Sequence, residues 1–140
     1  MKIIAIVVMV LGLITIFIPP LYTCDSQGNA IHLAGGKSIP MKCLWTARAE
    51  IGLGILLLVV GIFLFISSKL ESRRFLSILT LILGILIILL PIAFVGVCIN
   101  PEMPCVVVMK PTLLLIGLVT GAFGIAGIVW NFTMRYQTDR

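Results

Sequence analysis

The sequence predicts an all-α integral membrane protein, a four-helix bundle made of two antiparallel transmembrane hairpins. Of its 140 residues, 61% are hydrophobic and only 11% are charged, and the mean hydropathy is +1.26. A soluble domain carries about 25% charged residues, so most of this surface is expected to face lipid. A spanning helix needs about 20 mainly apolar residues, which leaves room for four spans and short connections. Because no soluble catalytic domain fits beside them, we expect a protein that is not an enzyme.

Four apolar stretches predict the spans, at about 3–18, 47–67, 75–97 and 112–130. The first is expected to stop at Pro19-Pro20, because proline cannot donate a backbone hydrogen bond. Each stretch is apolar around the whole helix, as expected for burial in lipid or in a bundle. The predicted connections within this single domain, residues 1–140, are 21–46, 68–74 and 98–111.

The segment before Cys24 has the order of a signal peptide that ends at a lipidated cysteine. Tyr22 and Thr23 do not fit such a cleavage site, and the apolar region of a cleaved signal is only about 7–15 residues long. We therefore expect an uncleaved first span.

The positions of Lys and Arg predict the orientation in the membrane. Six lie at the termini and in the 68–74 turn: Lys2, Lys69, Arg73, Arg74, Arg135 and Arg140. Four lie on the other side: Lys37, Lys42, Arg48 and Lys110. Basic residues near spans stay cytoplasmic. We therefore expect a protein of the cytoplasmic membrane of a prokaryote, with both termini in the cytoplasm and the loops 21–46 and 98–111 outside it. The net charge of +5 is then an orientation signal and does not indicate nucleic-acid binding.

All the cysteines fall in the two predicted outer loops, at Cys24, Cys43, Cys98 and Cys105. Cysteines on an oxidising face form disulfides, and four of them allow three connectivities. Each half of the chain has the order span, loop with two cysteines, span, and a methionine stands two residues before the second cysteine. This repeat favours the pairs Cys24–Cys43 and Cys98–Cys105. Closing a loop of roughly 15 residues stabilises a fold by about 3 kcal/mol.

Two other chemistries stay open for the same loops. Thioether and thiolate are soft ligands that suit Cu(I), so Met41, Cys43, Met103 and Cys105 form an alternative metal set, to which His32 could add a nitrogen. Thiol–disulfide exchange is the second alternative, although the chain has no C-x-x-C motif. If the cysteines form disulfides, no thiolate is left to bind a metal. We expect structural bridges, with no metal and no other cofactor.

Arg48 and Glu50 lie at the predicted outer mouth of the second span, where ionisable residues are functional candidates. Being two residues apart, they are expected on different helix faces. Alternatively, Arg48 anchors the membrane interface and Glu50 caps the first helical turn, with Thr46 as N-cap residue. Trp45 fits an interfacial aromatic belt.

Glycines give the fourth span a second candidate interface. Gly117 and Gly121 have the four-residue spacing that lets two membrane helices approach closely. They are expected either to pack the bundle internally or to dock a larger partner.

The stretch from Met41 to Glu50, M-K-C-L-W-T-A-R-A-E, resembles a bacterial and archaeal membrane family called domain of unknown function 4418. The family pattern is M-K-C-x-W-T-x-x-A-E at the start of the second of four spans, then a cysteine and M-P-C before the fourth. The matching residues here are Met41, Lys42, Cys43, Trp45, Thr46, Ala49, Glu50, Cys98, Met103, Pro104 and Cys105. Leu44 stands where relatives frequently have histidine, which weakens a carried-over metal site.

The resemblance implies a function as well as a fold. Genes of this family tend to lie beside an ATPase and a permease of the macrolide-exporter or cell-division type. The resemblance therefore implies a non-enzymatic accessory or scaffold subunit of an ABC-type transporter, in contact with the permease, the ATPase and membrane lipid. In that role Trp45, Thr46, Arg48 and Glu50 would form the interface or anchor the loop. An outer-face thiol-redox or Cu(I)-handling protein is the alternative, and the oligomeric state stays open.

Overall fold

The computed structural model describes residues 2–23, 31–32, 38–39, 42–95 and 105–138. The elements, in chain order, are α1 (Lys2–Leu21), β1 (Ile31–His32), β2 (Ser38–Ile39), α2 (Lys42–Ile66), α3 (Leu70–Leu89), the π-helical turns η1 (Leu90–Phe94) and η2 (Cys105–Met109), and α4 (Lys110–Thr138). The four long helices are long and apolar enough to cross a membrane. The predicted all-α, multi-pass fold is confirmed. Its one small addition is the antiparallel pairing of β1 with β2 in the first connection.

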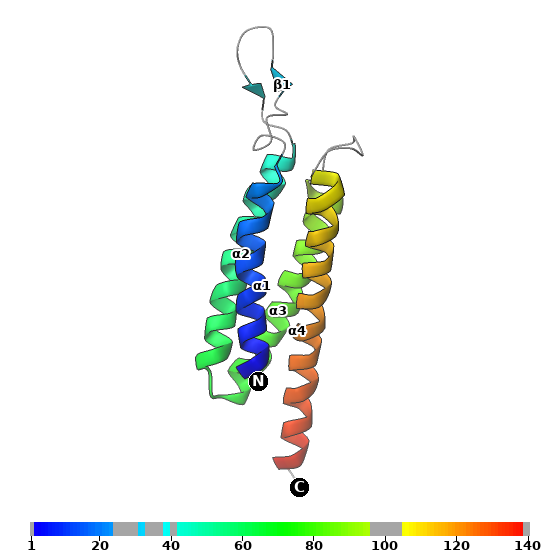
Figure 1. Ribbon diagram of the computed structural model, residues 1–140. Coiled ribbons are helices and arrows are strands. Elements are labelled where there is room, and N and C mark those ends of the chain that lie inside the picture. The colour runs from blue at the N-terminus through cyan, green and yellow to red at the C-terminus, as the bar shows by residue number, and fades with distance from the viewer. Residues whose placement is uncertain (1, 24–30, 33–37, 40–41, 96–104, 139–140) are drawn as a thin grey trace.

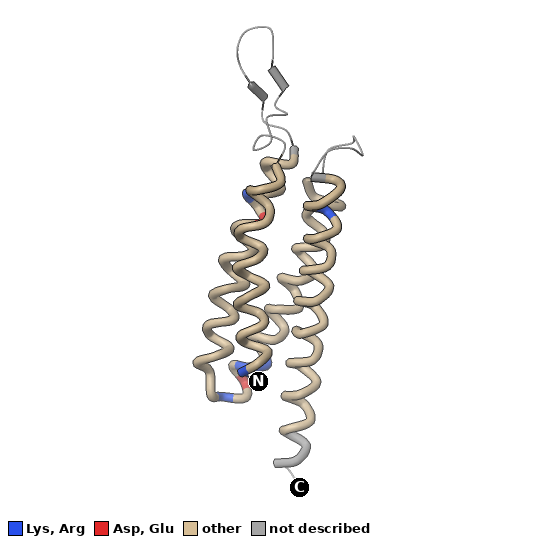
Figure 2. The backbone as a smooth tube through the Cα atoms, viewed as in Figure 1, with Lys and Arg blue, Asp and Glu red and all other residues tan. Residues whose placement is uncertain are grey.

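The helices pair as two antiparallel hairpins (Figure 1). Helix α1 packs along α2, and α3 packs along α4, whereas contacts between the hairpins are sparser. We call the end where α2 turns into α3 the turn end; the start of α1 and the end of α4 also lie there. The opposite end, where α1 finishes and α2 begins, is the loop end. Within the described helices, charged residues lie near these two ends and the middle is uncharged (Figure 2).

The helices extend beyond the predicted apolar runs. Helix α2 begins at Lys42 and α3 at Leu70, so parts of the predicted connections 21–46 and 68–74 are helical. Helix α4 runs from Lys110 to Thr138, beyond the predicted 112–130. Apolar runs locate the lipid-facing part of a helix, whereas backbone hydrogen bonding decides where the helix ends.

Prolines lie near the loop end of both hairpins. The first span is expected to stop at Pro19-Pro20, and α1 includes both prolines and ends one residue later, at Leu21. The φ angle of proline is itself helical, and only the carbonyl four residues earlier loses its donor. In the second hairpin, Pro91 lies in the wider turns of η1, where the Val95 N–H donates to the Leu90 carbonyl at 3.1 Å. A π-turn of this kind accommodates the missing donor without ending the helix.

Each hairpin is held together by a reciprocal pair of glycines. A Cβ atom added to Gly12 would lie 3.1 Å from the Gly54 carbonyl oxygen, and one added to Gly54 would lie 3.0 Å from the Gly12 oxygen. Gly84 and Gly117 repeat this arrangement at 3.0 and 2.9 Å. Such distances are shorter than ordinary Cβ contacts, so the close approach of the two backbones depends on glycine.

The neighbours of these glycines repeat as well. A Cβ atom added to Gly54 would meet Ile16, and one added to Gly117 would meet Ile88. In the same way, a Cβ atom on Gly61 would meet Met9, and one on Gly124 would meet Leu81. Met9, Gly12, Ile16 and Pro19 have the same spacing as Leu81, Gly84, Ile88 and Pro91. The internal repeat that the cysteine loops indicate therefore extends to the packing of the helices.

Buried hydroxyl groups in the bundle are satisfied locally. The side chains of Thr15, Ser77, Thr80 and Thr120 each donate to the carbonyl four residues earlier, at 2.7–2.8 Å. Such bonds let small polar residues lie in an apolar bundle without an unpaired group. Two ionisable side chains, Glu50 and Arg74, have buried polar atoms that find no hydrogen-bond partner among the described residues. They lie at opposite ends of the bundle.

Candidate functional site at the start of helix α2

The candidate site is the part of the motif that forms the first turns of α2, from Cys43 to Glu50, at the loop end. The sequence places Thr46 at the start of a helix, but α2 begins at Lys42. Thr46 is therefore in the second turn and is not an N-cap residue. Because an α-helix has 3.6 residues per turn, the motif is divided between two faces of one helix.

One face of the motif points into the bundle. Cys43, Thr46, Ala47 and Glu50 are all at most 2% exposed. Cys43 and Ala47 belong to the continuous apolar core of the bundle. Their spacing of three and four residues keeps them on one side of α2. This inner face fixes the rotation of α2 about its own axis.

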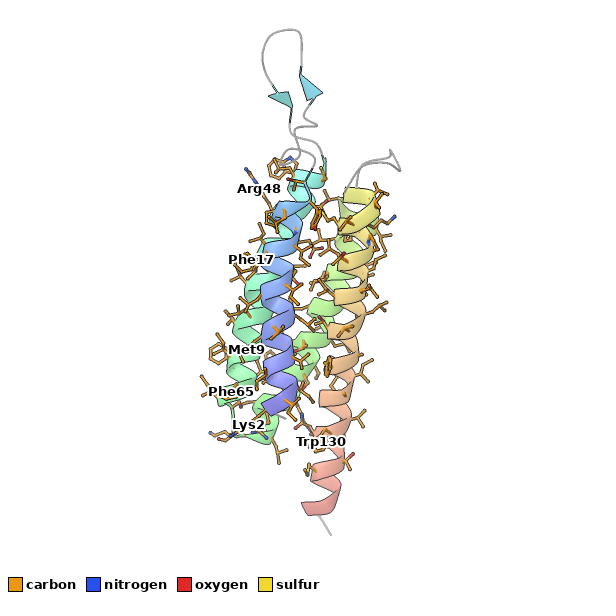
Figure 3. All side chains as sticks on the ribbon, viewed as in Figure 1. Lys2, Met9, Phe17, Arg48, Phe65 and Trp130 are labelled. Carbon is orange, nitrogen blue, oxygen red and sulfur yellow. The ribbon has the colours of Figure 1, made fainter. Side chains whose placement is uncertain are left out.

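The other face of the motif points outward. Trp45 is 57% exposed, and Arg48 is exposed as well. The Arg48 guanidinium carbon lies 5.7 Å from the centroid of the Trp45 ring, within the range of a cation–π contact. Figure 3 shows the Arg48 side chain directed away from the bundle. Arg48 and Glu50 therefore lie on different helix faces, as their spacing predicts.

Glu50 is the unusual member of the inner face. Its side chain is completely buried, and neither carboxyl oxygen has a hydrogen-bond partner among the described residues. Burying such a group without a partner is costly.

The alternative role of Glu50 as a cap of the first turn is wrong, because α2 has no acidic residue in its first turn. Glu50 precedes Gly54 by the same interval that separates Leu113 from Gly117, and Leu113 is equally buried. The second hairpin thus has an apolar residue at the corresponding position.

The sequence model of a family described as Domain of unknown function (DUF4418) matches residues 3–130. The chain belongs to this family. No curated protein and no solved structure matches the chain. The DUF4418 match includes the whole motif at the start of α2 and confirms the resemblance that the motif indicates. The description of the family names no activity.

The two predicted interface glycines of this DUF4418 protein lie away from the motif, between α3 and α4. A Cβ atom added to Gly117 would lie 2.5 Å from a side-chain carbon of Ile88. A Cβ atom added to Gly84 would lie 2.7 Å from the Gly121 backbone nitrogen. Of the two uses that the sequence leaves open for these glycines, the structure shows internal packing.

The predicted chemistry of the DUF4418 cysteines falls largely outside the described residues. Cys24, Met41, Cys98 and Met103 lie outside them, and so do the side chains of His32 and Cys105. The Cys43 side chain is completely buried at the start of α2. The two disulfides and the alternative Cu(I) ligands therefore stay predictions.

Sequence reasoning does not identify Asn131 as a buried polar residue of the bundle. Asn131 is 1% exposed, and its amide nitrogen donates to the Gly127 carbonyl at 2.7 Å. It adjoins the predicted end of the fourth span, and a single amide beside an apolar run is the signal that could find it. The structure places Asn131 near Arg74, where both line a cavity at the turn end.

Proposed function

We propose that this DUF4418 protein is a non-enzymatic accessory or scaffold subunit of a membrane complex, and that the complex is an ABC-type transporter of the macrolide-exporter kind. The gene neighbourhood implied by the family supports the choice of complex. The observation that carries the proposal is the outward face of the motif. Trp45 and Arg48 lie within cation–π distance of each other and remain exposed, while the rest of the described motif is buried or half-buried.

An exposed Trp–Arg pair is well suited to binding a protein partner. Both residue types are enriched among the few residues that dominate binding energy at interfaces. The N–H donors of a guanidinium lie in the plane of the group, where they can bind a carboxylate with two hydrogen bonds while an aromatic ring lies near the face of the group. We therefore propose that the pair receives an acidic side chain of the permease.

The buried face of the motif supports the exposed one. Cys43, Ala47 and Glu50 fix the orientation of α2, and the helix holds Trp45 and Arg48 at a constant separation. A binding group on a rigid helix loses little conformational entropy when the partner binds. In the predicted orientation the loop end lies outside the cytoplasm, so the pair would meet the permease near the outer boundary of the membrane.

Co-purification tests this proposal. The tagged full-length protein is purified from its native membranes in mild detergent, and the neighbouring ATPase and permease are quantified by mass spectrometry. Arg48→Gln and Trp45→Ala are each expected to weaken binding by about 30-fold, since losing a dominant interface residue costs about 2 kcal/mol. The control is Phe65→Ala, which removes an exposed aromatic at the other end of α2 and should leave recovery unchanged. Absence of both subunits from the wild-type preparation, or equal recovery with all three variants, contradicts the proposal.

The state of the cysteines separates this function from the thiol-redox or Cu(I) alternative. Protein purified without reductant is alkylated, digested and analysed by mass spectrometry. Two complete bridges, unchanged by copper, support a structural role for the cysteines. Thiols that react, or Cu(I) bound at a fixed ratio, favour the alternative.

A further inference from the structure

A second polar site lies at the turn end, far from the motif. It is a cavity of about 220 Å³ lined by Leu70, Glu71, Arg74 and Asn131. A bound water needs only about 10–15 Å³ of accessible space, so the cavity has room for a group of several heavy atoms. The lining contains a cation, an anion and an amide beside an apolar side chain.

Arg74 lines this cavity and carries one buried donor atom without a partner among the described residues. Its guanidinium carbon lies 4.4 Å from the centroid of the Phe132 ring, which holds the group in place. The Nη2 atom is buried and has no hydrogen-bond partner among the described residues. A buried donor without an acceptor is costly, and more so when it carries charge. An acceptor for this donor has to come from outside the described residues, and a ligand that enters the cavity beside the guanidinium is one source.

The neighbouring arginine is used differently. The Nε atom of Arg73 donates to the Ser67 carbonyl at 2.8 Å, which ties the start of α3 to the end of α2. Asn131 is likewise fixed by its bond to Gly127. Arg73 thus shapes the turn, whereas Arg74 faces the cavity.

The second charge in the lining restricts the ligand. Glu71 is exposed and lies three residues before Arg74 in the first turn of α3. Its carboxylate repels a ligand that carries only negative charge. A group with a phosphate and an ammonium matches both charges at once, because guanidinium binds phosphate through several N–H donors and carboxylate accepts from ammonium.

An apolar groove adjoins the cavity at Glu71. This second hollow, of about 580 Å³, is lined by Phe63, Ile66, Ser67, Glu71, Ser72, Phe75 and Leu76. Four of these side chains are apolar and come from the facing ends of α2 and α3. The two hollows share Glu71 as a lining residue and are therefore neighbours, which suits a ligand with a charged head and a hydrocarbon chain.

We propose that the cavity binds the zwitterionic headgroup of a phosphatidylethanolamine-type lipid, with the phosphate on Arg74, the ammonium on Glu71 and hydrocarbon in the adjoining groove. This site is independent of the proposed transporter role. It makes the turn end a specific lipid contact, in addition to the non-specific contact that all four apolar helices make.

Native mass spectrometry of the delipidated full-length protein in detergent tests the site. The protein is titrated with phosphatidylethanolamine, with phosphatidylglycerol, which lacks the ammonium, and with soluble phosphoethanolamine and inorganic phosphate. We expect phosphatidylethanolamine to bind at least about tenfold more tightly than phosphatidylglycerol, since charge-assisted hydrogen bonds are the stronger ones. Binding of inorganic phosphate or soluble phosphoethanolamine as tight as that of the lipid would overturn a lipid site.

Variants assign the two charges. Arg74→Gln is expected to lower the affinity for phosphatidylethanolamine by about tenfold or more, with Arg74→Lys retaining part of it. Glu71→Gln should shift the preference toward phosphatidylglycerol. The control is Lys69→Gln, which removes a charge from the same turn without lining the cavity. Equal lipid affinity in Arg74→Lys, Glu71→Gln and the wild type overturns the proposal. It is also overturned if co-purification of the permease requires Arg74 in delipidated protein, because the cavity would then bind a protein.

Discussion

The two hairpins share one packing scheme but differ in where they carry polar groups. Gly12 and Gly54 hold the first hairpin together as Gly84 and Gly117 hold the second. The loop end differs, as the positions counted back from Gly54 in α2 and from Gly117 in α4 show. The first hairpin has Trp45, Arg48 and Glu50 there, and the second has Val108, Pro111 and Leu113 at the corresponding positions. The second hairpin therefore packs without a charged group at these three positions, and Lys110, at the start of α4, is its charged residue at the loop end.

The second hairpin departs from the repeat at the opposite end. Arg74 and Asn131 line a cavity there, and the position in α1 that corresponds to Arg74 is the exposed Lys2. The shared positions explain the fold, and the positions that differ are where function is to be sought. The comparison places one candidate site on each hairpin, at opposite ends of the bundle.

The largest effect is expected from the shared glycines. Gly117→Ala would put a Cβ atom 2.9 Å from a backbone oxygen, and Gly12→Ala would put one 2.9 Å from the Leu58 backbone nitrogen. Backbone atoms cannot rotate aside, so each change should lower the free energy of unfolding by about 3 kcal/mol, the upper part of the range for overpacking. Thermal unfolding followed by circular dichroism in detergent measures this loss.

The matched control for the glycines is Gly52→Ala. Nothing lies within 4 Å of a Cβ atom at that position, and alanine is the better helix former, so this variant should be at least as stable as the wild type. If Gly12→Ala is damaging and Gly117→Ala is tolerated, the two hairpins do not share one packing scheme.

An intermediate effect, of opposite sign, is expected at Glu50. Replacing Glu50 with leucine copies the second hairpin, where Leu113 is buried at the corresponding position. Because the Glu50 carboxyl is buried without a hydrogen-bond partner among the described residues, Glu50→Leu should raise the free energy of unfolding by about 2 kcal/mol, the typical cost of an unsatisfied buried group.

Lys69→Leu is the control for this change, since Lys69 is exposed and its replacement should shift stability by less than about 0.5 kcal/mol. A Glu50→Leu variant that is less stable than the wild type would show that the carboxyl has a stabilising partner. The difference between the hairpins would then be structural.

The four spans and their pairing follow from the sequence, because long apolar runs and short connections determine them. The ends of the helices do not follow in the same way. The first turns of α2 contain Trp45 and Thr46, which lie in the predicted connection 21–46, yet the helix already begins at Lys42. The first span was expected to stop at Pro19-Pro20, and α1 includes both prolines before it ends at Leu21, because the φ angle of proline is itself helical.

Part of the candidate site also follows from the sequence. The two-residue spacing predicts that Arg48 and Glu50 lie on different faces, but spacing alone does not determine which face is buried. The burial of Glu50 and the packing of Gly117 against α3 depend on how the helices rotate in the bundle. The cavity around Arg74 and Asn131 joins residues from two helices, and such a meeting has no local signature in the sequence.

The smallest effect on stability is expected from the exposed pair. Arg48→Gln removes a cation–π contact with Trp45, and such contacts contribute about 0.5–1 kcal/mol at exposed sites. The loss in the free energy of unfolding should therefore stay below about 1 kcal/mol, measured by the same thermal unfolding as for the glycine variants. If Arg48→Gln lowers the free energy of unfolding as much as Gly12→Ala does, the pair is part of the packing.

A small loss of stability together with a large loss of permease binding would instead separate the two roles. The shared glycines would then hold the fold, and the unrepeated Trp45–Arg48 pair would bind the partner.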